Sequence, residues 1–183
     1  MFRSLDISGF GFGAKVFLTG LPGVKMPLTE FMVALKQQQV QHVLSLISLE
    51  ELSQLSSEYA FYAERHLAST YQEGQVGSWQ QHIYGIADYG VPQDMESYLK
   101  LIEGLKELLL RGENLLIHCH AGIGRTGMTA VALLLALGMD LEEALIRVRE
   151  GGSSPETSKQ QQFLQQFQTM ISSTKPSNSL ESS

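Results

Sequence analysis

Hydrophobic and polar positions along the chain follow two periods, one typical of strands and one typical of helices. Four short runs are continuously apolar or alternate between apolar and polar residues, whereas longer segments repeat an apolar residue every three or four positions. The predicted strands cover residues 15–19, 41–47, 79–84 and 115–117. The predicted helices cover residues 28–36, 50–55, 59–67, 95–110, 128–137, 141–149 and 158–171.

Strands alternate with helices in the first part of the chain, and helices accumulate in the second part. This order indicates the α/β class, with a central mixed, mostly parallel sheet flanked by helices. The helix predicted at 95–110 is the most clearly amphipathic, because its apolar residues share one face. An aromatic stripe of Tyr59, Phe61 and Tyr62 on the helix at 59–67 is expected to belong to the core.

The length and composition favour a single domain. A chain of 183 residues with 43% hydrophobic content can build a sizeable core, and it has no room for a second one. We expect this domain to span residues 1–172. The polar residues 173–183 are expected to form a disordered tail.

Charge and cysteine content restrict the partners. The net charge of −6 and a pI of about 5.3 provide no basic field for nucleic acid or an anionic membrane surface. No stretch is long enough to span a bilayer, and no signal-peptide core forms near the N-terminus. Cys119 is the single cysteine, which excludes an intrachain disulfide and suits a reducing compartment. We expect a cytoplasmic monomer that binds neither nucleic acid nor a membrane.

The candidate chemistry lies in residues 115–127, with the sequence LLIHCHAGIGRTG. The predicted strand delivers His118 and Cys119 to a glycine-containing loop, and Arg125 opens the following helix. A thiolate is strongly nucleophilic, but an ordinary thiol with a pKa of roughly 8.5 is mostly protonated at neutral pH. Free amides at a helix start, the positive end of the helix dipole and an arginine all favour the charged sulfur.

The same loop suits a phosphate dianion. Arg125 can donate two parallel hydrogen bonds to two phosphate oxygens. Gly122 and Gly124 allow the backbone to turn its amides inward. Thr126 places a hydroxyl next to the sulfur, where it would stabilise a departing thiolate.

Three other interpretations of the loop compete with a nucleophile. Cys119 can be an ordinary buried thiol, since free cysteine packs like a small hydrophobic residue. The triplet of His118, Cys119 and His120 can be a metal site, although neighbouring residues at a strand end point in different directions and a metal needs convergent ligands. The loop can also bind phosphate without turning it over.

Residues 118–127 resemble the HCxxGxxR[ST] signature of the cysteine-dependent protein tyrosine and dual-specificity phosphatases. The resemblance extends over about residues 15–167. Within this family, the chain is most similar to the cyclin-dependent kinase-associated phosphatase group, and this similarity implies a dual-specificity-phosphatase-like fold. It implies that Cys119 is the nucleophile, and that His118 orients the loop and tunes the thiolate. The residues expected to bind the phosphoryl group are His120, Ala121, Gly122, Ile123, Gly124 and Arg125.

A general acid is also required, because the leaving alkoxide or phenoxide must be protonated. Residues 88–92, DYGVP, are similar to the DxGxP acid loop of these phosphatases, which makes Asp88 the expected acid. Gly85 and Gly90 bracket this residue and suit the hinges of a mobile loop. Asp94 is the competing carboxylate, and we interpret it as the N-cap of the next helix. Tyr89 is expected to contact the substrate.

A weaker element is the segment ETSKQ at residues 156–160. Several family members carry QTxxQ here, with a glutamine that positions the hydrolytic water. Gln160 matches the second glutamine and is the expected supporting residue, whereas Glu156 replaces the first. Gln161, Gln162 or a solvated glutamine-rich helix face are the alternatives.

The resemblance implies a two-step reaction through a phosphocysteine that requires no metal and no cofactor. The expected partner is a phosphorylated protein, with phosphate or another oxyanion in the loop. No tyrosine precedes Tyr59, so the deep pocket of phosphotyrosine-specific domains is not expected. Phosphotyrosine is the favoured substrate, and phosphoserine and phosphothreonine are expected to be accepted as well. A non-protein phosphatase, such as one acting on phosphoinositides, and a binding module with little turnover are the alternatives.

Overall fold

The computed structural model describes residues 1–67 and 79–174. Within these ranges five strands form one sheet, in the order β1 (Arg3–Leu5), β2 (Val16–Thr19), β5 (Asn114–His118), β3 (Val40–Ser45) and β4 (Gln80–Ile83). The last four strands in this order are parallel, whereas β1 is antiparallel to β2 at the sheet edge. The mixed, mostly parallel sheet predicted from the sequence is therefore confirmed.

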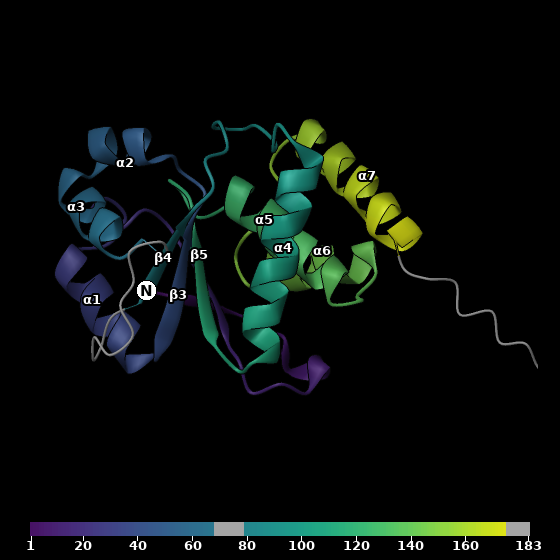
Figure 1. The fold of residues 1–183 in the computed structure, drawn as a ribbon, viewed down its shortest axis with the longest axis horizontal. Coiled ribbons are helices and arrows are strands. Elements are labelled where there is room, and N and C mark those ends of the chain that lie inside the picture. The colour runs from purple at the N-terminus through teal and green to yellow at the C-terminus, as the bar shows by residue number, and fades with distance from the viewer. Residues whose placement is uncertain (68–78, 175–183) are drawn as a thin grey trace, which may run out of the picture.

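Helices cover both faces of this sheet (Figure 1). One face carries α1 (Leu28–Gln37), α2 (Leu49–Leu55) and α3 (Ser57–Arg65). The other face carries α4 (Met95–Leu110), α5 (Gly124–Ala136), α6 (Leu141–Glu150) and α7 (Ser158–Thr174). Every residue of α5 is buried, because this helix packs against β5 and is surrounded by α4, α6 and α7.

The central strand β5 positions the site. All five of its residues are buried between β2 and β3, with His118 opposite Thr19 on one side and Ser45 on the other. Because parallel strands end at the same edge, the segments that follow these three strands meet there. Cys119 follows directly after β5 and therefore lies at this edge.

Two short elements near the N-terminus were not predicted. β1 has three residues, and a single 3₁₀ turn, η1 (Ser8–Phe10), follows it. Three residues are too few to establish a period, so β1 is recognised only by its pairing with β2.

The prediction that the aromatic stripe on α3 belongs to the core is confirmed for Tyr59 and wrong for Phe61 and Tyr62. Tyr59 is completely buried and packs edge-to-face on Phe31, with ring centroids 5.4 Å apart. Phe61 and Tyr62 are 51% and 37% exposed. The buried face of α3 is formed by Tyr59, Ala60 and Ala63. At about 100° per residue Phe61 lies on the opposite side of the helix from this face, and Tyr62 lies beyond its edge.

The C-terminal helix α7 ends at Thr174, three residues beyond the predicted end. The remainder of the predicted disordered tail, residues 175–183, lies outside the described residues. Within the described ranges, no helix is both long and apolar enough to cross a membrane.

Candidate active site

The Cys119 loop (residues 119–123) connects β5 to α5 at the carboxyl end of the sheet. Cys119 is 2% exposed, and its Sγ accepts a hydrogen bond from the Gly122 amide at 3.2 Å. No side chain caps the start of α5 at Ile123. The first amides of this helix are therefore available to an anion, as the sequence predicts.

Position 122 requires glycine for two reasons, its backbone conformation and its close packing. Its φ of 75° lies in the left-handed region that favours glycine. A Cβ at this position would collide with the carbonyl group of Thr19. The loop therefore rests directly on the backbone at the end of β2.

Arg125 is the charged centre of the site. Its side chain is 2% exposed, and Nη1 donates to the carbonyl oxygen of Ile86 at 2.8 Å. Nη2 lies 3.2 Å from Asp88 Oδ1, and Nη1 lies 3.7 Å from Glu51 Oε2. Carboxylates from two separate elements therefore face one buried guanidinium.

The Asp88 loop (residues 84–94) connects β4 to α4 and brings the predicted acid to Arg125. Asp88 lies on a tight turn closed by a 2.8 Å bond from the Gly90 amide to the Ala87 carbonyl, and its side chain is 60% exposed. Tyr89 follows with φ of 55°, a costly conformation for a bulky residue, and is 63% exposed. The acid is thus both accessible and close to the loop arginine.

Asp94 has the structural role expected for it. Its carboxylate accepts hydrogen bonds from the Glu96 and Ser97 amides at the start of α4. These bonds lower the pKa of Asp94 below its ordinary value. Asp94 is therefore the N-cap of α4.

Gly85 and Gly90 each have a packing reason to lack a side chain. A Cβ on Gly85 would lie 3.0 Å from Ser48, and one on Gly90 would lie 2.9 Å from the Ala87 carbonyl oxygen. Neither glycine adopts a positive φ. Their role as hinges stays a prediction.

The side chain of Gln160 makes two hydrogen bonds at the start of α7. This residue is completely buried, its Oε1 accepts from the Glu156 amide at 2.8 Å, and its Nε2 donates to the Gly90 carbonyl at 3.0 Å. Thr157 Oγ1 makes a parallel, longer contact of 3.5 Å with the Tyr89 carbonyl. The Gln160 amide therefore ties the Asp88 loop to α7, and its role in positioning the hydrolytic water stays a prediction.

His118 is buried beneath the loop. Burial lowers its pKa to about 4, so the imidazole is neutral at pH 7. Its Nε2 lies 2.9 Å from the Tyr59 hydroxyl, and its Nδ1 lies 3.4 Å from the Cys119 carbonyl oxygen. Burial raises the pKa of Tyr59, which keeps this hydroxyl protonated. These contacts agree with the predicted orienting role of His118.

Thr126 does not make the predicted bond to the sulfur. Among the described residues, its Oγ1 is a buried side-chain oxygen without a hydrogen-bond partner. A buried hydroxyl with an unused donor is costly. Thr126 therefore retains a donor in the first turn of α5.

The other predicted binding residues lie in the loop with unequal exposure. His120 is half-buried, and its carbonyl accepts from the Leu21 amide at 2.9 Å. Ala121 is exposed, Ile123 is half-buried and Gly124 is buried against Glu156. Their backbone amides, rather than their side chains, are the groups suited to an oxyanion.

Three residues around the loop were missed by sequence reasoning. Glu51 reaches Arg125 from the first turn of α2, where the Ser48 cap was the available sequence signal. Arg3 on β1 and Ser153 after α6 both donate to the carbonyl oxygen of Gly122. No sequence pattern connects these two residues with a loop more than 30 positions away.

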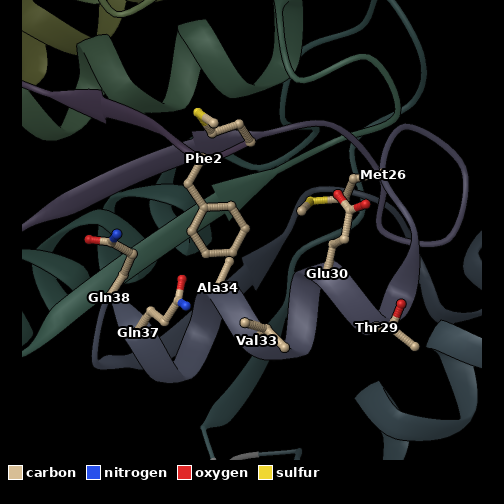
Figure 2. Close-up of a pocket in the computed structure, with 9 residues that line it drawn as sticks. Phe2, Met26, Thr29, Glu30, Val33, Ala34, Gln37 and Gln38 are labelled. Atoms are coloured by element: carbon tan, nitrogen blue, oxygen red, sulfur yellow. The ribbon is translucent and has the colours of Figure 1, made fainter.

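Within residues 1–67 and 79–174, no group of three or more His, Cys, Asp or Glu side chains is arranged to hold a metal ion. A separate groove of about 510 Å³ lies between the N-terminal residues and α1. Figure 2 shows the Phe2 ring over this helix, with Glu30 at one end and Gln38 at the other. The lining of this groove includes no residue of the Cys119 loop, and its one carboxylate, Glu30, does not suit a phosphate.

Comparison with known proteins shows the family. The Protein-tyrosine phosphatase family model matches residues 57–169. Cyclin-dependent kinase inhibitor 3 of Rattus norvegicus is 28% identical over 163 residues, which cover 84% of this chain and 72% of that protein. The Homo sapiens protein of the same name is 30% identical over 141 residues, which cover 75% of this chain and 61% of that protein.

Solved structures agree with this result. A kinase associated phosphatase with its catalytic cysteine replaced by serine matches with a TM-score of 0.75 at 25% identity, covering 94% of this chain and 96% of that one. PTPMT1 shares the fold, with a TM-score of 0.65 at 18% identity over 94% of this chain and 97% of that one. The chain belongs to the protein-tyrosine phosphatase family and is a protein-tyrosine/dual-specificity phosphatase similar to the kinase-associated phosphatase group.

Proposed function

We propose that this enzyme hydrolyses phosphotyrosine in proteins through a phosphocysteine formed on Cys119. The observation that carries the proposal is the convergence of three separate elements. The end of β5 supplies the nucleophile, the start of α5 supplies Arg125, and the Asp88 loop places a carboxylate 3.2 Å from that guanidinium. A phosphoryl group bound to Arg125 lies between a sulfur and an acid.

In the first step the Cys119 thiolate attacks phosphorus. A P–S bond forms, the P–O bond to the tyrosine oxygen breaks, and the protonated Asp88 carboxyl gives its proton to that oxygen. Arg125 and the loop amides bind the equatorial oxygens of the transferring group, where negative charge concentrates.

In the second step a water attacks the phosphocysteine. The Asp88 carboxylate takes a proton from this water, a new P–O bond forms, and the P–S bond breaks to release phosphate and regenerate the thiolate. The unpaired Thr126 hydroxyl provides a donor for the departing sulfur. The cycle needs only the residues of this chain and water.

The substrate range follows from the openness of the site. The Asp88 side chain and Tyr89 are both more than half exposed, which supports a site that is accessible from solvent. A shallow site admits the shorter phosphoserine and phosphothreonine. Phosphotyrosine is favoured because a phenoxide leaves more easily than an alkoxide. The loop carries no lysine between Cys119 and Arg125, which gives no added charge for a phosphoinositide head group.

The test is kcat/KM on peptides that are identical except for the phosphorylated residue, with phosphoinositide vesicles assayed in parallel. We expect phosphotyrosine to be turned over fastest, with measurable turnover of both aliphatic phosphoesters. Inert aliphatic phosphoesters would contradict the shallow site. Faster turnover of phosphoinositides than of every peptide would contradict a protein substrate.

The same proposal includes the environment of the enzyme. A thiolate nucleophile needs a reducing compartment, and this supports a cytoplasmic protein. The reaction needs no residue of a second subunit, and this supports a monomer. Fractionation of cells that express the tagged full chain tests the first part, and sedimentation of the purified chain tests the second.

A further inference from the structure

Arg3 on the edge strand β1 holds the Cys119 loop from outside the catalytic centre. Its Nη2 donates to the carbonyl oxygen of Gly122 and lies 3.3 Å from Ser153 Oγ, while its Nη1 donates to the Gly152 carbonyl at 2.7 Å. Ser153 Oγ donates to the same Gly122 oxygen at 2.7 Å. One loop carbonyl therefore receives a charged and a neutral donor.

Gly122 is consequently fixed on both of its sides. Its amide donates to the Cys119 sulfur at 3.2 Å, and its carbonyl is held by Arg3 and Ser153. In a trans peptide the C=O and the following N–H point in opposite directions. Holding the Gly122 carbonyl outward therefore turns the Ile123 amide toward the inside of the loop, where a phosphoryl oxygen binds.

Within residues 1–67 and 79–174, no carboxylate forms an ion pair with Arg3. Its partners are two carbonyls and a hydroxyl. Burial lowers the pKa of Arg3, and the charge of the Cys119 thiolate acts in the opposite direction. Gly122 connects the two groups, because its carbonyl binds Arg3 and its amide binds the Cys119 sulfur at 3.2 Å.

We propose that Arg3 is a positioning residue of the phosphatase reaction, which fixes the Gly122–Ile123 peptide and stabilises the charged sulfur of Cys119. This inference rests on the proposed role of Cys119 as the nucleophile. It assigns to the N-terminal edge strand a function in catalysis, and it makes Arg3 a second cation for the loop beside Arg125.

The test uses the full chain with Arg3→Met, Arg3→Lys and Ser153→Ala. Arg147→Met is the matched control, because Arg147 is an arginine that pairs only with Asp6 and Glu143 among the described residues. Two quantities are measured: kcat and KM on an aryl phosphate, and the pH midpoint of Cys119 alkylation by iodoacetamide without substrate. Alkylation reports the thiolate directly and does not depend on turnover.

We expect Arg3→Met to lower kcat/KM about 10- to 100-fold, the usual effect of removing a group that orients active-site ligands. The alkylation midpoint should move to higher pH. Arg3→Lys should keep the midpoint of the unsubstituted protein but only part of its kcat. Lysine keeps the positive charge, but it lacks the planar guanidinium that donates to two acceptors at once. Ser153→Ala should lower kcat without moving the midpoint, and this variant tests the carbonyl contact even if Arg3→Met fails to fold.

Two results would overturn the proposal. One is a folded Arg3→Met variant with unchanged kcat/KM and an unchanged alkylation midpoint. The other is an equal loss in Arg147→Met, which would show a general effect of removing charge. Failure of the Cys119 mechanism is recognised separately, because Cys119→Ser would then retain activity whatever the Arg3 variants do.

Discussion

The Asp88 carboxylate lies 3.2 Å from the guanidinium of Arg125, although Asp88 lies in the loop after β4 and Arg125 lies in the first turn of α5. Arg125 also donates to the carbonyl of Ile86, two positions before the acid. Arg125, which we propose binds the phosphoryl group, therefore also holds the loop that carries the proposed acid.

The first prediction separates the two carboxylates of the Asp88 loop. Asp88→Asn should lower kcat by about 10²–10⁴, the usual range for a lost general acid, and flatten the alkaline limb of the pH–rate profile. Asp94→Asn is the matched control and should change kcat little, because asparagine also caps helices. Steady-state kinetics of both variants between pH 5 and about 9 provide the check. A large loss of kcat in Asp94→Asn, together with little loss in Asp88→Asn, would show that Asp88 is not the general acid.

The second prediction concerns the contact between Gln160 and Gly90. Gln160→Leu removes the 3.0 Å bond that ties the Asp88 loop to α7. The variant should lose more activity on alkyl phosphates than on aryl phosphates, since poor leaving groups depend most on the acid. Gln161→Leu, an exposed neighbour, is the control.

The same experiment distinguishes this role from the positioning of water. Hydrolysis of the phosphocysteine is the same step for every substrate, so a lost water-positioning residue would slow that step regardless of the leaving group. A burst of released alcohol or phenol, followed by the same steady-state rate on all substrates, would therefore favour the role first predicted for Gln160.

The third prediction uses the backbone of Tyr89. Its φ of 55° costs about 1 kcal/mol for a bulky residue, and glycine adopts it freely. Tyr89→Gly should therefore leave the free energy of unfolding unchanged or higher, while KM for a phosphotyrosine peptide rises. Urea unfolding and peptide kinetics measure the two effects. An unchanged KM would show that the exposed ring makes no contact with the substrate.

The fourth prediction follows from buried histidines. Burial lowers the pKa of both His82 and His118 to about 4, and that of His42 below its ordinary value. The unfolded chain takes up protons on these residues near pH 6.5, whereas the folded protein does not. The contribution of these histidines to the free energy of unfolding is therefore fully present above pH 6.5 and is lost as the pH falls toward 4. At pH 5 the loss is on the order of 1–2 kcal/mol for a histidine whose folded pKa is about 4.

Urea unfolding between pH 7 and about 5 tests this prediction. His82→Gln should give a shallower dependence on pH, because one of the titrating groups is removed. Stability that stays constant or rises as the pH falls would contradict it.

The sequence predicted the parts of the site that depend on local spacing. Cys119, Arg125 and the glycines lie within one strand–loop–helix segment, so their mutual placement is largely local. Asp88 was found because chemistry requires an acid and its own segment carries a pattern. The N-cap role of Asp94 was likewise visible from its position before an amphipathic helix.

The remaining features depend on tertiary contacts, which the hydrophobic periods of strands and helices do not predict. Arg3 lies on a three-residue strand and meets a loop 119 positions away. Glu51 meets Arg125 only because α2 lies at the same end of the sheet. The orientation of the Gln160 amide depends on where the Asp88 loop passes, and the exposure of Phe61 depends on the rotation of α3.

The central claim is a covalent phosphocysteine on Cys119, and rapid acid quenching tests it most directly. The full chain is mixed with ³²P-labelled phosphotyrosine peptide, quenched within one turnover, digested and sequenced, with Cys119→Ser as the control. We expect label on the peptide that contains Cys119 and none in the control. Turnover without protein-bound label, or label on any other residue, would contradict it.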